Sequence, residues 1–175
     1  AAGLAGKEVL MIGAGAGGIW CAEALRNEGF SGEITVLSAD RELPYDRPML
    51  SKGLIAGEAP LKYLPLRSSG FYDAQNIRIL TDTPASRLEP ADRTIVTADG
   101  RTLAGDAVLL ATGGTPRTLQ IPGADKRRVH TLRTQADALA IIRSCEDAGR
   151  AVIAGASFVG MGVAAQLAGR GVMVT

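Results

Sequence analysis

The hydrophobic pattern of the chain opens with a strand, a helix and a second strand. Glu8–Ile12 and Glu33–Leu37 are short apolar runs, which predict two buried strands. Between them, Ala16–Glu28 carries apolar residues at helical spacing, and Gly29 marks the end of this predicted helix. The apolar positions are Ile19, Trp20, Ala24 and Leu25. This order of elements predicts a complete βαβ unit within about 30 residues.

The central part of the chain alternates turn residues with short strand patterns. A proline-bearing loop over residues 43–51 leads into short helical pieces and then into a predicted strand at Ile77–Leu80. Asp99-Gly100 favours the positive φ angles of a two-residue hairpin turn. This turn lies within a predicted β-meander, whose strands are Ala85–Leu88, Thr94–Thr97 and Thr102–Ala104.

The last part of the chain repeats the parallel-sheet pattern. Ala107–Ala111 is a continuous apolar run, typical of a strand buried in a parallel sheet, and the turn residues Gly113–Pro116 end it. The elements predicted after it are a helix at Thr134–Ala148, a strand at Ala151–Ala154, a helix at Phe158–Ala168 and a strand at Val172–Thr175. The whole pattern predicts an α/β fold, a doubly wound parallel sheet with a β-meander plus the start of a second Rossmann-like unit.

A glycine-rich loop joins the first strand to the helix in each of the two βαβ patterns. In the first loop, Gly13 allows a tight exit from the strand, Gly15 lets the backbone approach a pyrophosphate, and Gly18 lets the helix pack on the sheet. The helix N-terminus then offers unpaired amides and a partial positive charge to phosphates. Gly155–Gly160 repeats this arrangement. Two such loops predict a protein that holds two nucleotides and passes electrons between them.

An acidic residue is expected near the end of the second strand, where it would accept hydrogen bonds from ribose hydroxyls. Asp40 is the residue available, a little beyond the end of the predicted strand. The alternative interpretation is that Asp40 only solvates the loop. The ribose contact is therefore left open by the sequence pattern.

Composition and charge exclude several classes of protein. Nineteen Lys and Arg against eighteen Asp and Glu give a formal net charge of +1, so no global field favours nucleic acid or an anionic membrane. Cys21 and Cys145 lack the paired spacing of a metal knuckle or a disulfide framework, and no metal site is predicted. No apolar run reaches the roughly 18 residues of a membrane span, and the Ala-rich start does not resemble a signal peptide. The expected location is the cytoplasm.

A specific resemblance rests on residues 43–52, whose sequence is LPYDRPMLSK. This segment resembles the PYxRPxLSK signature of FAD-dependent NAD(P)H:ferredoxin and rubredoxin reductases, within the pyridine nucleotide-disulphide oxidoreductase superfamily. ATGGTPR at 111–117 and LRT at 132–134 also match that family. CAEALRNEGF at 21–30 and GASFVGM at 155–161 are most similar to its apoptosis-inducing-factor-like, Rieske-associated subgroup. The resemblance covers the whole chain.

The resemblance implies an FAD/NAD(P)-binding fold of the glutathione-reductase type. It implies an FAD-binding domain at residues 1–120 and a partial NAD(P)-binding domain at 121–175. The implied activity is electron transfer from NAD(P)H through FAD to an iron–sulfur partner, either a ferredoxin or a Rieske-type protein or domain. Glutathione-reductase-type enzymes carry a redox CxxxxC after the second strand, and this chain does not. Hydride would therefore pass to the flavin, and single electrons onward, without a protein disulfide between them.

The resemblance also implies site residues, carried over position by position. The implied FAD contacts are Gly13, Ala14, Gly15, Ala16, Gly17, Gly18, Asp40, Arg47, Lys52, Ala85, Thr112, Gly113 and Arg133. The implied NAD(P) contacts are Gly155, Ala156, Ser157, Phe158, Val159 and Gly160. Arg47 would suit bidentate phosphate contacts, and Lys52 would stabilise reduced, anionic flavin. Ala85 would contact adenine through its backbone. For Arg133 the alternative is a surface salt bridge.

Three departures from the family pattern bear on activity. In the family, a glutamate two residues after the second loop's last glycine pairs with the lysine of LSK, and here that position is Gly162. Lys52 would therefore lack its counter-charge. The middle glycine of the second loop is Ser157, whose hydroxyl could donate to a phosphate. The family chain also continues through the nicotinamide domain and back to the flavin, so we expect an N-terminal fragment, inactive alone and prone to self-association.

Two other functional classes remain open from the sequence. A non-catalytic nucleotide-binding or interaction module is favoured by Gly162 and by the missing C-terminal half of the family chain. A single-nucleotide Rossmann dehydrogenase is disfavoured, because it leaves the β-meander and the second loop unexplained. No triad partner lies near His130, the only histidine, so a structural or solvent-facing role is predicted for it. The three tyrosines, Tyr45, Tyr63 and Tyr72, are interpreted as packing or loop residues.

Overall fold

A computed structural model describes residues 6–175 as two compact units. The first unit contains residues 6–45 together with residues 65–113, and the second contains residues 46–64 and 114–175. Each unit has its own parallel sheet. The segment 46–64 is therefore separated in sequence from the rest of the unit to which it belongs.

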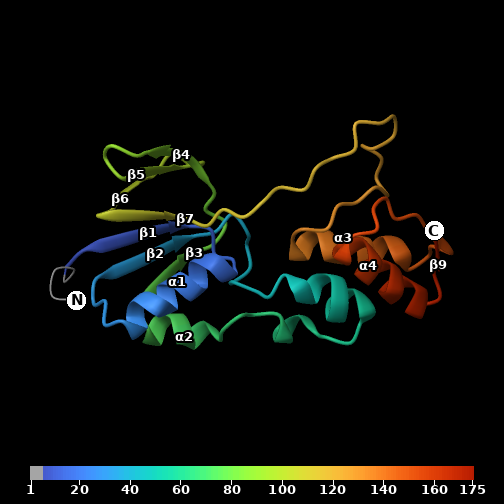
Figure 1. The fold of residues 1–175 in the computed structure, drawn as a ribbon, viewed down its shortest axis with the longest axis horizontal. Coiled ribbons are helices and arrows are strands. Elements are labelled where there is room, and N and C mark those ends of the chain that lie inside the picture. The colour runs from blue at the N-terminus through green and yellow to red at the C-terminus, as the bar shows by residue number, and fades with distance from the viewer. Residues whose placement is uncertain (1–5) are drawn as a thin grey trace. The chain divides into compact units, whose positions relative to one another are not determined.

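The first unit is built on a parallel sheet of four strands in the order β3-β2-β1-β7 (Figure 1). The strands are β1 (Glu8–Ile12), β2 (Glu33–Leu37), β3 (Ile77–Leu80) and β7 (Ala107–Leu110). Leu10 in β1 lies opposite Thr35 of β2 and Val108 of β7. The predicted strands lie within a residue of these bounds, because continuous apolar runs mark strands that are buried on both faces.

Helices cover one face of this sheet and a β-meander covers the other (Figure 1). The helices are α1 (Ala16–Asn27) and α2 (Ser69–Ala74), and the meander is β4 (Ala85–Glu89), β5 (Thr94–Thr97) and β6 (Thr102–Ala104). Alternate residues point to opposite faces. Met11 packs with the helix-side core, whereas its neighbour Leu10 packs with Ile95 of β5. The predicted α/β fold with a parallel sheet and a meander is confirmed.

Two local predictions are wrong in detail. Trp20 is 52% exposed, because α1 turns Ile19 and Ala22 toward the sheet and leaves Trp20 on the outer face, beneath the Arg67 guanidinium at 4.6 Å.

The meander turn also spans more than two residues. The amide of Thr97 donates to the carbonyl of Arg101, and only Gly100 of the enclosed residues has a positive φ, at +86°.

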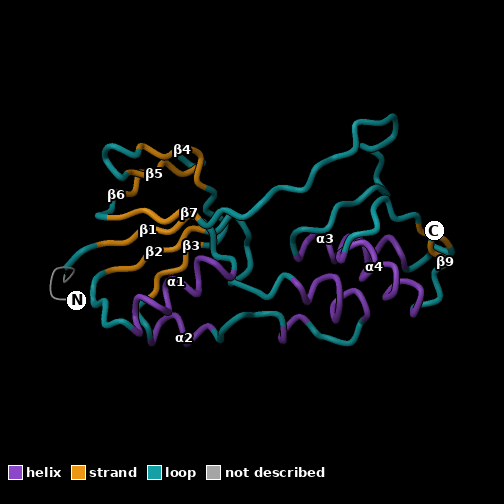
Figure 2. The backbone as a smooth tube through the Cα atoms, in the orientation of Figure 1, coloured by secondary structure: helices purple, strands orange, loops and turns teal. Residues whose placement is uncertain are grey.

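The second unit combines short parallel strands with four helical segments, drawn in purple in Figure 2. The helical segments are the π-helix η1 (Leu50–Leu54), the 3-10 helix η2 (Leu61–Tyr63), α3 (Gln135–Cys145) and α4 (Phe158–Gly169). The strands β8 (Arg150–Ala151) and β9 (Met173–Val174) pair in parallel and are shorter than predicted. Both α3 and α4 contact η1, so the segment 46–64 packs on helices from the C-terminal part of the sequence.

The two ends of the segment 46–64 lie next to each other. Tyr45 forms an isolated antiparallel bridge with Pro65, and the amide of Leu66 donates to the carbonyl of Pro44 at 2.8 Å. The amide of Asp46 donates to the carbonyl of Leu64, also at 2.8 Å. Residues 46–64 therefore form an insertion between β2 and α2 of the first unit, and the two ends of this insertion are hydrogen-bonded to each other.

Candidate functional site

The first glycine-rich loop adopts a conformation that requires glycine at both of its ends. Gly13 has φ +112°, and a Cβ added there would lie 2.1 Å from the carbonyl oxygen of Ala111. A Cβ added at Gly18 would lie 2.0 Å from the carbonyl oxygen of Gly13. These separations are far below van der Waals contact, so both glycines are dictated by close backbone packing between β1, β7 and α1.

The N-terminus of α1 is open in the way that a phosphate site requires. Its N-cap residue, Gly15, has no side chain to cap the helix, and no acidic residue lies in the first turn. Nothing lies within 4 Å of the position that a Cβ on Gly15 would take. By contrast, α3 is closed by a capping box between Thr134 and Asp137. The first loop therefore fits a pyrophosphate group, because its amides and helix dipole face an unobstructed position.

The second loop repeats the backbone conformation of the first. Gly155 has φ +116°, and a Cβ added at Gly160 would lie 2.1 Å from the carbonyl oxygen of Gly155. Ser157 occupies the N-cap position with φ −80° and ψ 175°, close to the −76° and −174° of Gly15. These angles are open to any residue, so Ser157 in place of glycine leaves the loop geometry intact.

Asp40 lies beyond the carboxyl end of β2 and is held by several hydrogen bonds. Its amide donates to Ser38 Oγ at 3.2 Å, and its carbonyl accepts from the amide of Asp82 at 2.9 Å. The Tyr45 hydroxyl donates to Asp40 Oδ2 at 2.9 Å. The sequence interpretation of Tyr45 as a packing or loop residue did not include this contact.

Several predicted contacts of the first unit gather at the carboxyl edge of its parallel sheet. Thr112 and Gly113 are exposed and follow β7, and the Ala111 amide before them donates to the carbonyl of Ile12 at 2.8 Å. They therefore lie at the same edge of the sheet as the loop from Gly13 to Gly18. Ala85 is half-buried at the start of β4, opposite Thr97. Ligands of open α/β sheets bind at this edge.

The second unit brings together two arginines that the sequence analysis assigned separately. Arg47 Nη1 donates to the carbonyl oxygen of Arg133 at 2.7 Å. The amide of Arg133 donates to Asp137 Oδ2 at 2.9 Å, within the capping box of α3. Both backbone polar groups of Arg133 are therefore fixed, and its side chain starts from a rigid backbone.

Lys52 belongs to η1 and is exposed, and α4 lies beside this π-helix. A Cβ added at Gly162 would lie 3.8 Å from the backbone oxygen of Ser51 and 3.9 Å from Ser51 Oγ. Further along α4, Arg170 Nη1 donates to the carbonyl oxygen of Ile55 at 2.9 Å. A side chain at position 162 would therefore be directed at the turn that carries Lys52, which is where the resemblance places a glutamate.

The perturbed pKa values belong to groups with structural roles. Burial raises the pKa of Tyr72 to about 12, and its hydroxyl has no hydrogen-bond partner in the described part of the chain. Burial also lowers the pKa of Arg26, whose guanidinium donates to four backbone carbonyls between 2.6 and 2.8 Å. A hydrogen bond from Thr97 lowers the pKa of Asp99 in the meander turn. These shifts do not indicate an acid–base centre at either loop.

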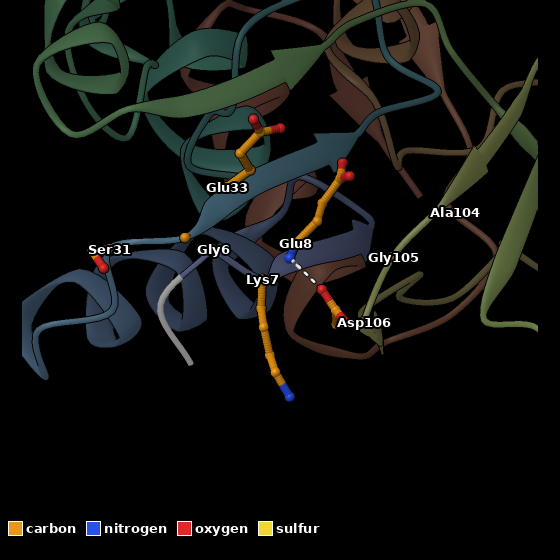
Figure 3. Close-up of a pocket in the computed structure, with 9 residues that line it drawn as sticks. Gly6, Lys7, Glu8, Ser31, Glu33, Ala104, Gly105 and Asp106 are labelled. Carbon is orange, nitrogen blue, oxygen red and sulfur yellow. Dashed lines mark hydrogen bonds between the residues drawn. The ribbon is translucent and has the colours of Figure 1, made fainter. Parts of the chain in front are cut away.

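A hollow of about 600 Å³ lies at the opposite edge of the first sheet (Figure 3). It is lined by residues that precede or begin β1, β2 and β7, including Lys7, Glu33 and Asp106. The Asp106 carboxylate accepts a hydrogen bond from the amide of Glu8 at 2.8 Å. This hollow faces the amino ends of the strands, whereas nucleotides bind at the carboxyl ends, so it is not the predicted site.

The remaining candidate groups are accounted for by local contacts. His130 Nε2 hydrogen-bonds to Ser144 Oγ at 2.8 Å. Cys21 and Cys145 are free and half-buried on α1 and α3. Among residues 6–175, no group of three or more His, Cys, Asp or Glu side chains could hold a metal ion. Within the same residues, no helix has the length and apolar character that crossing a membrane requires.

Comparison with known proteins connects nearly all of the described chain to one family. Residues 7–175 match the family described as pyridine nucleotide-disulphide oxidoreductase. Apoptosis-inducing factor 3 of Mus musculus is 44% identical over 160 residues, which are 91% of this chain and 26% of that protein. The ferredoxin reductase component of chlorobenzene dioxygenase from Cupriavidus sp. (strain PS12) is 40% identical over 95% of this chain and 40% of its own length.

A solved structure shares the same fold. The covalent complex of putidaredoxin reductase with putidaredoxin contains a chain that superposes with a TM-score of 0.89 at 34% identity. The match covers 96% of this chain and 41% of that one. The chain therefore spans between about a quarter and two fifths of the length of these relatives.

Proposed function

The chain belongs to the pyridine nucleotide-disulphide oxidoreductase family, whose members use FAD and NAD(P)H, and on this basis we propose that it is part of an FAD-dependent NAD(P)H:ferredoxin reductase. The proposed activity is electron transfer from NAD(P)H through the flavin to an iron–sulfur partner. We propose a cytoplasmic location for it. The domain division at residue 120 remains part of this proposal, with an FAD-binding domain at residues 1–120 and a partial NAD(P)-binding domain at 121–175, from which Arg133 would also contact FAD.

One observation carries the proposal, namely that the chain contains two strand-to-helix loops of the same conformation. Gly13 has φ +112° and Gly155 has φ +116°. A Cβ added at Gly18 would lie 2.0 Å from the carbonyl oxygen of Gly13, and one added at Gly160 would lie 2.1 Å from that of Gly155. Both helices that follow begin without a side-chain cap. Such paired loops suit a protein that holds two nucleotides at once.

In the first unit, the proposed role of the loop 13–18 is to hold the pyrophosphate of FAD. The amides at the start of α1 would donate to phosphate oxygens, and glycine leaves room for the backbone to approach. The Asp40 carboxylate would accept from ribose hydroxyls, and the Ala85 backbone would contact adenine. Thr112 and Gly113 would border the same edge of the sheet.

In the second unit, the proposed contacts with FAD are Arg47, Lys52 and Arg133. A guanidinium donates to phosphate oxygens in a fork, and an exposed ammonium offers a point charge to an anionic flavin. The loop 155–160 would hold the pyrophosphate of NAD(P). FAD, when bound, supplies the redox chemistry, and the chain's residues bind it, orient it and exclude water.

The proposed electron acceptor is a ferredoxin or a Rieske-type iron–sulfur protein or domain. Support comes from the names of the relatives, which include a ferredoxin reductase component of a dioxygenase and a reductase joined to putidaredoxin. A second candidate is a nucleotide-binding module without catalysis, and one observation favours it. Position 162 faces the turn of Lys52 but carries glycine, so no carboxylate reaches that turn from α4.

Two measurements on the longer protein that carries this chain separate the candidates. We expect a purified protein with the absorption bands of bound flavin, and oxidation of NADH or NADPH in the presence of an artificial one-electron acceptor. Bound flavin without oxidation of either nucleotide would favour the non-catalytic module. A protein that binds neither flavin nor NAD(P)H would contradict both.

A further inference from the structure

Tyr45 is a buried tyrosine whose hydroxyl donates a hydrogen bond to a carboxylate. The side chain is 5% exposed, and its hydroxyl lies 2.9 Å from Asp40 Oδ2. A phenol donating to an ionised carboxylate forms a charge-assisted bond, which is shorter and stronger than a bond between neutral groups. The hydroxyl therefore fixes the position of one carboxylate oxygen of Asp40.

The backbone on both sides of this bond is also fixed. Tyr45 pairs with Pro65, and the flanking Pro44 carbonyl accepts from Leu66 at 2.8 Å. Asp40 is anchored through its amide to Ser38, as described above, and Ser38 is itself 6% exposed. A carboxylate held through backbone and side chain loses little rotamer freedom when a ligand binds, so it is pre-organised as a hydrogen-bond acceptor.

We infer that Tyr45 is a positioning residue that holds the Asp40 carboxylate for recognition of the ribose hydroxyls of an adenine nucleotide. The inference rests on the proposed function, because it needs a nucleotide on the first loop. An ionised carboxylate has only acceptor capacity, so it pairs with hydroxyl donors and repels a phosphate. Tyr45 would thereby favour nucleotides with an intact 2′-hydroxyl over those that lack it or carry a 2′-phosphate.

A matched control exists within the same unit. Tyr72 is also buried, at 3% exposure, but its hydroxyl has no hydrogen-bond partner within the described residues. Tyr45→Phe and Tyr72→Phe each remove one hydroxyl from a buried ring and leave the ring in place. Only the first change removes a donor from Asp40, so a difference between the two variants reports on that bond.

The test measures the affinity of the 175-residue chain and its variants for ADP, 2′-deoxy-ADP and adenosine 2′,5′-bisphosphate by NMR titration. We expect the wild-type chain to bind ADP at least roughly 10-fold more tightly than 2′-deoxy-ADP, as one charge-assisted hydrogen bond implies. In Tyr45→Phe this ratio should fall to about 2, mainly through weaker ADP binding. Tyr72→Phe should keep the wild-type ratio.

Asp40→Ala tests the same bond from its other side, because it removes the oxygens that accept from Tyr45 and from ribose. It should abolish the preference for ADP and weaken the rejection of the bisphosphate, and adding Tyr45→Phe to it should not change the affinity for either nucleotide further. Equal losses of affinity for ADP and 2′-deoxy-ADP in Tyr45→Phe would show a purely structural role and overturn the inference. Affinities that do not change at all would overturn it too, and the first loop would remain a nucleotide site. A wild-type chain that binds none of the three nucleotides would overturn the site itself.

Discussion

Arg47 Nη1 donates to the backbone carbonyl of Arg133 at 2.7 Å, so the two arginines that the family resemblance assigned to FAD independently are joined within one unit. The contact spans a sequence separation of 86 residues. One consequence is that the loss of Arg47 would disturb Arg133 even without a ligand. The two residues cannot be treated as separate contributions to nucleotide affinity, because changes at interacting sites are not additive.

Replacing Arg47 with glutamine should therefore loosen the backbone at residues 131–134. A hydrogen bond from a charged donor contributes about 1.5–3 kcal/mol, and part of this stabilisation should be lost. Hydrogen exchange of the Arg133 and Thr134 amides would measure the effect. Arg117→Gln is the matched control, since Arg117 is exposed. Equal exchange rates in both variants would show that the contact does not stabilise the loop.

Glycines 15 and 18 should separate folding from binding. A Cβ at Gly18 would clash with the Gly13 carbonyl at 2.0 Å, so Gly18→Ala should destabilise the first unit by about 1–3 kcal/mol or more. Gly15 has an ordinary φ of −76° and open space around it, so Gly15→Val should fold normally. The same change should abolish nucleotide binding, because its side chain blocks the approach to the loop. Denaturation curves and ADP titrations would check both outcomes.

Position 162 offers a direct test of the charge environment of Lys52. A Cβ there would make ordinary van der Waals contact with Ser51, so the first side-chain atom is accommodated. In the longer protein, Gly162→Glu should increase flavin retention or the rate of hydride transfer, since it returns a carboxylate to the turn of Lys52. Gly162→Gln is the isosteric control and should leave both unchanged. A flavin potential and rate that do not respond to Gly162→Glu would contradict a lysine–glutamate pairing.

The buried phenol of Tyr72 should make stability depend on pH above 10. Burial raises its pKa from 10.0 to about 12, so the unfolded chain releases this proton at a lower pH than the folded protein does. The stabilisation linked to the neutral phenol is complete below pH 10 and is lost as the pH rises through about 12. Melting temperatures at pH 9 and pH 11 should differ more in the wild type than in Tyr72→Phe. Parallel pH dependence in the two proteins would contradict the shift.

Apolar side chains exposed on the second unit should promote self-association of the isolated chain. Val152 is 82% exposed, Phe158 99% and Met173 61%. Exposed apolar groups gathered in one unit favour contact between copies. Light scattering should show a mass that rises with concentration, and Phe158→Ser should reduce this rise. A chain that stays monomeric at high concentration would contradict the prediction.

The sequence predicted the parallel strands of the first unit and the positions of the two glycine-rich loops well, because their signals are local. Continuous apolar runs indicate buried strands, and glycines at fixed spacing indicate close backbone packing. The structure contains that packing at Gly13 and Gly18. The exposed position of Trp20 was not predictable in the same way. Trp20 is apolar and falls at helical spacing, which suggested a buried position. In the structure one face of its ring packs against the Arg67 guanidinium, and Arg67 lies far away in the sequence.

The candidate site was predicted only in part, for a related reason. Motif matching named Arg47 and Arg133 but could not show that one holds the backbone of the other. Tyr45 was missed because a tyrosine in a loop gives no signal for the partner of its hydroxyl. Hydrogen bonds between segments that are distant in sequence form only once the fold brings those segments together. A motif in one segment therefore does not predict its partner in another.

The bridge between Tyr45 and Pro65 has a consequence for synthesis on the ribosome. It lets the first unit close around its own strands while residues 46–64 are still looped out. The packing partners of that segment, α3 and α4, are made only when residues 135–169 emerge. At about 5–20 residues per second, Leu50, Leu54 and Ile55, which are buried in the finished protein, therefore stay exposed for several seconds. We therefore expect a chaperone that binds exposed apolar segments to bind the nascent chain at these residues.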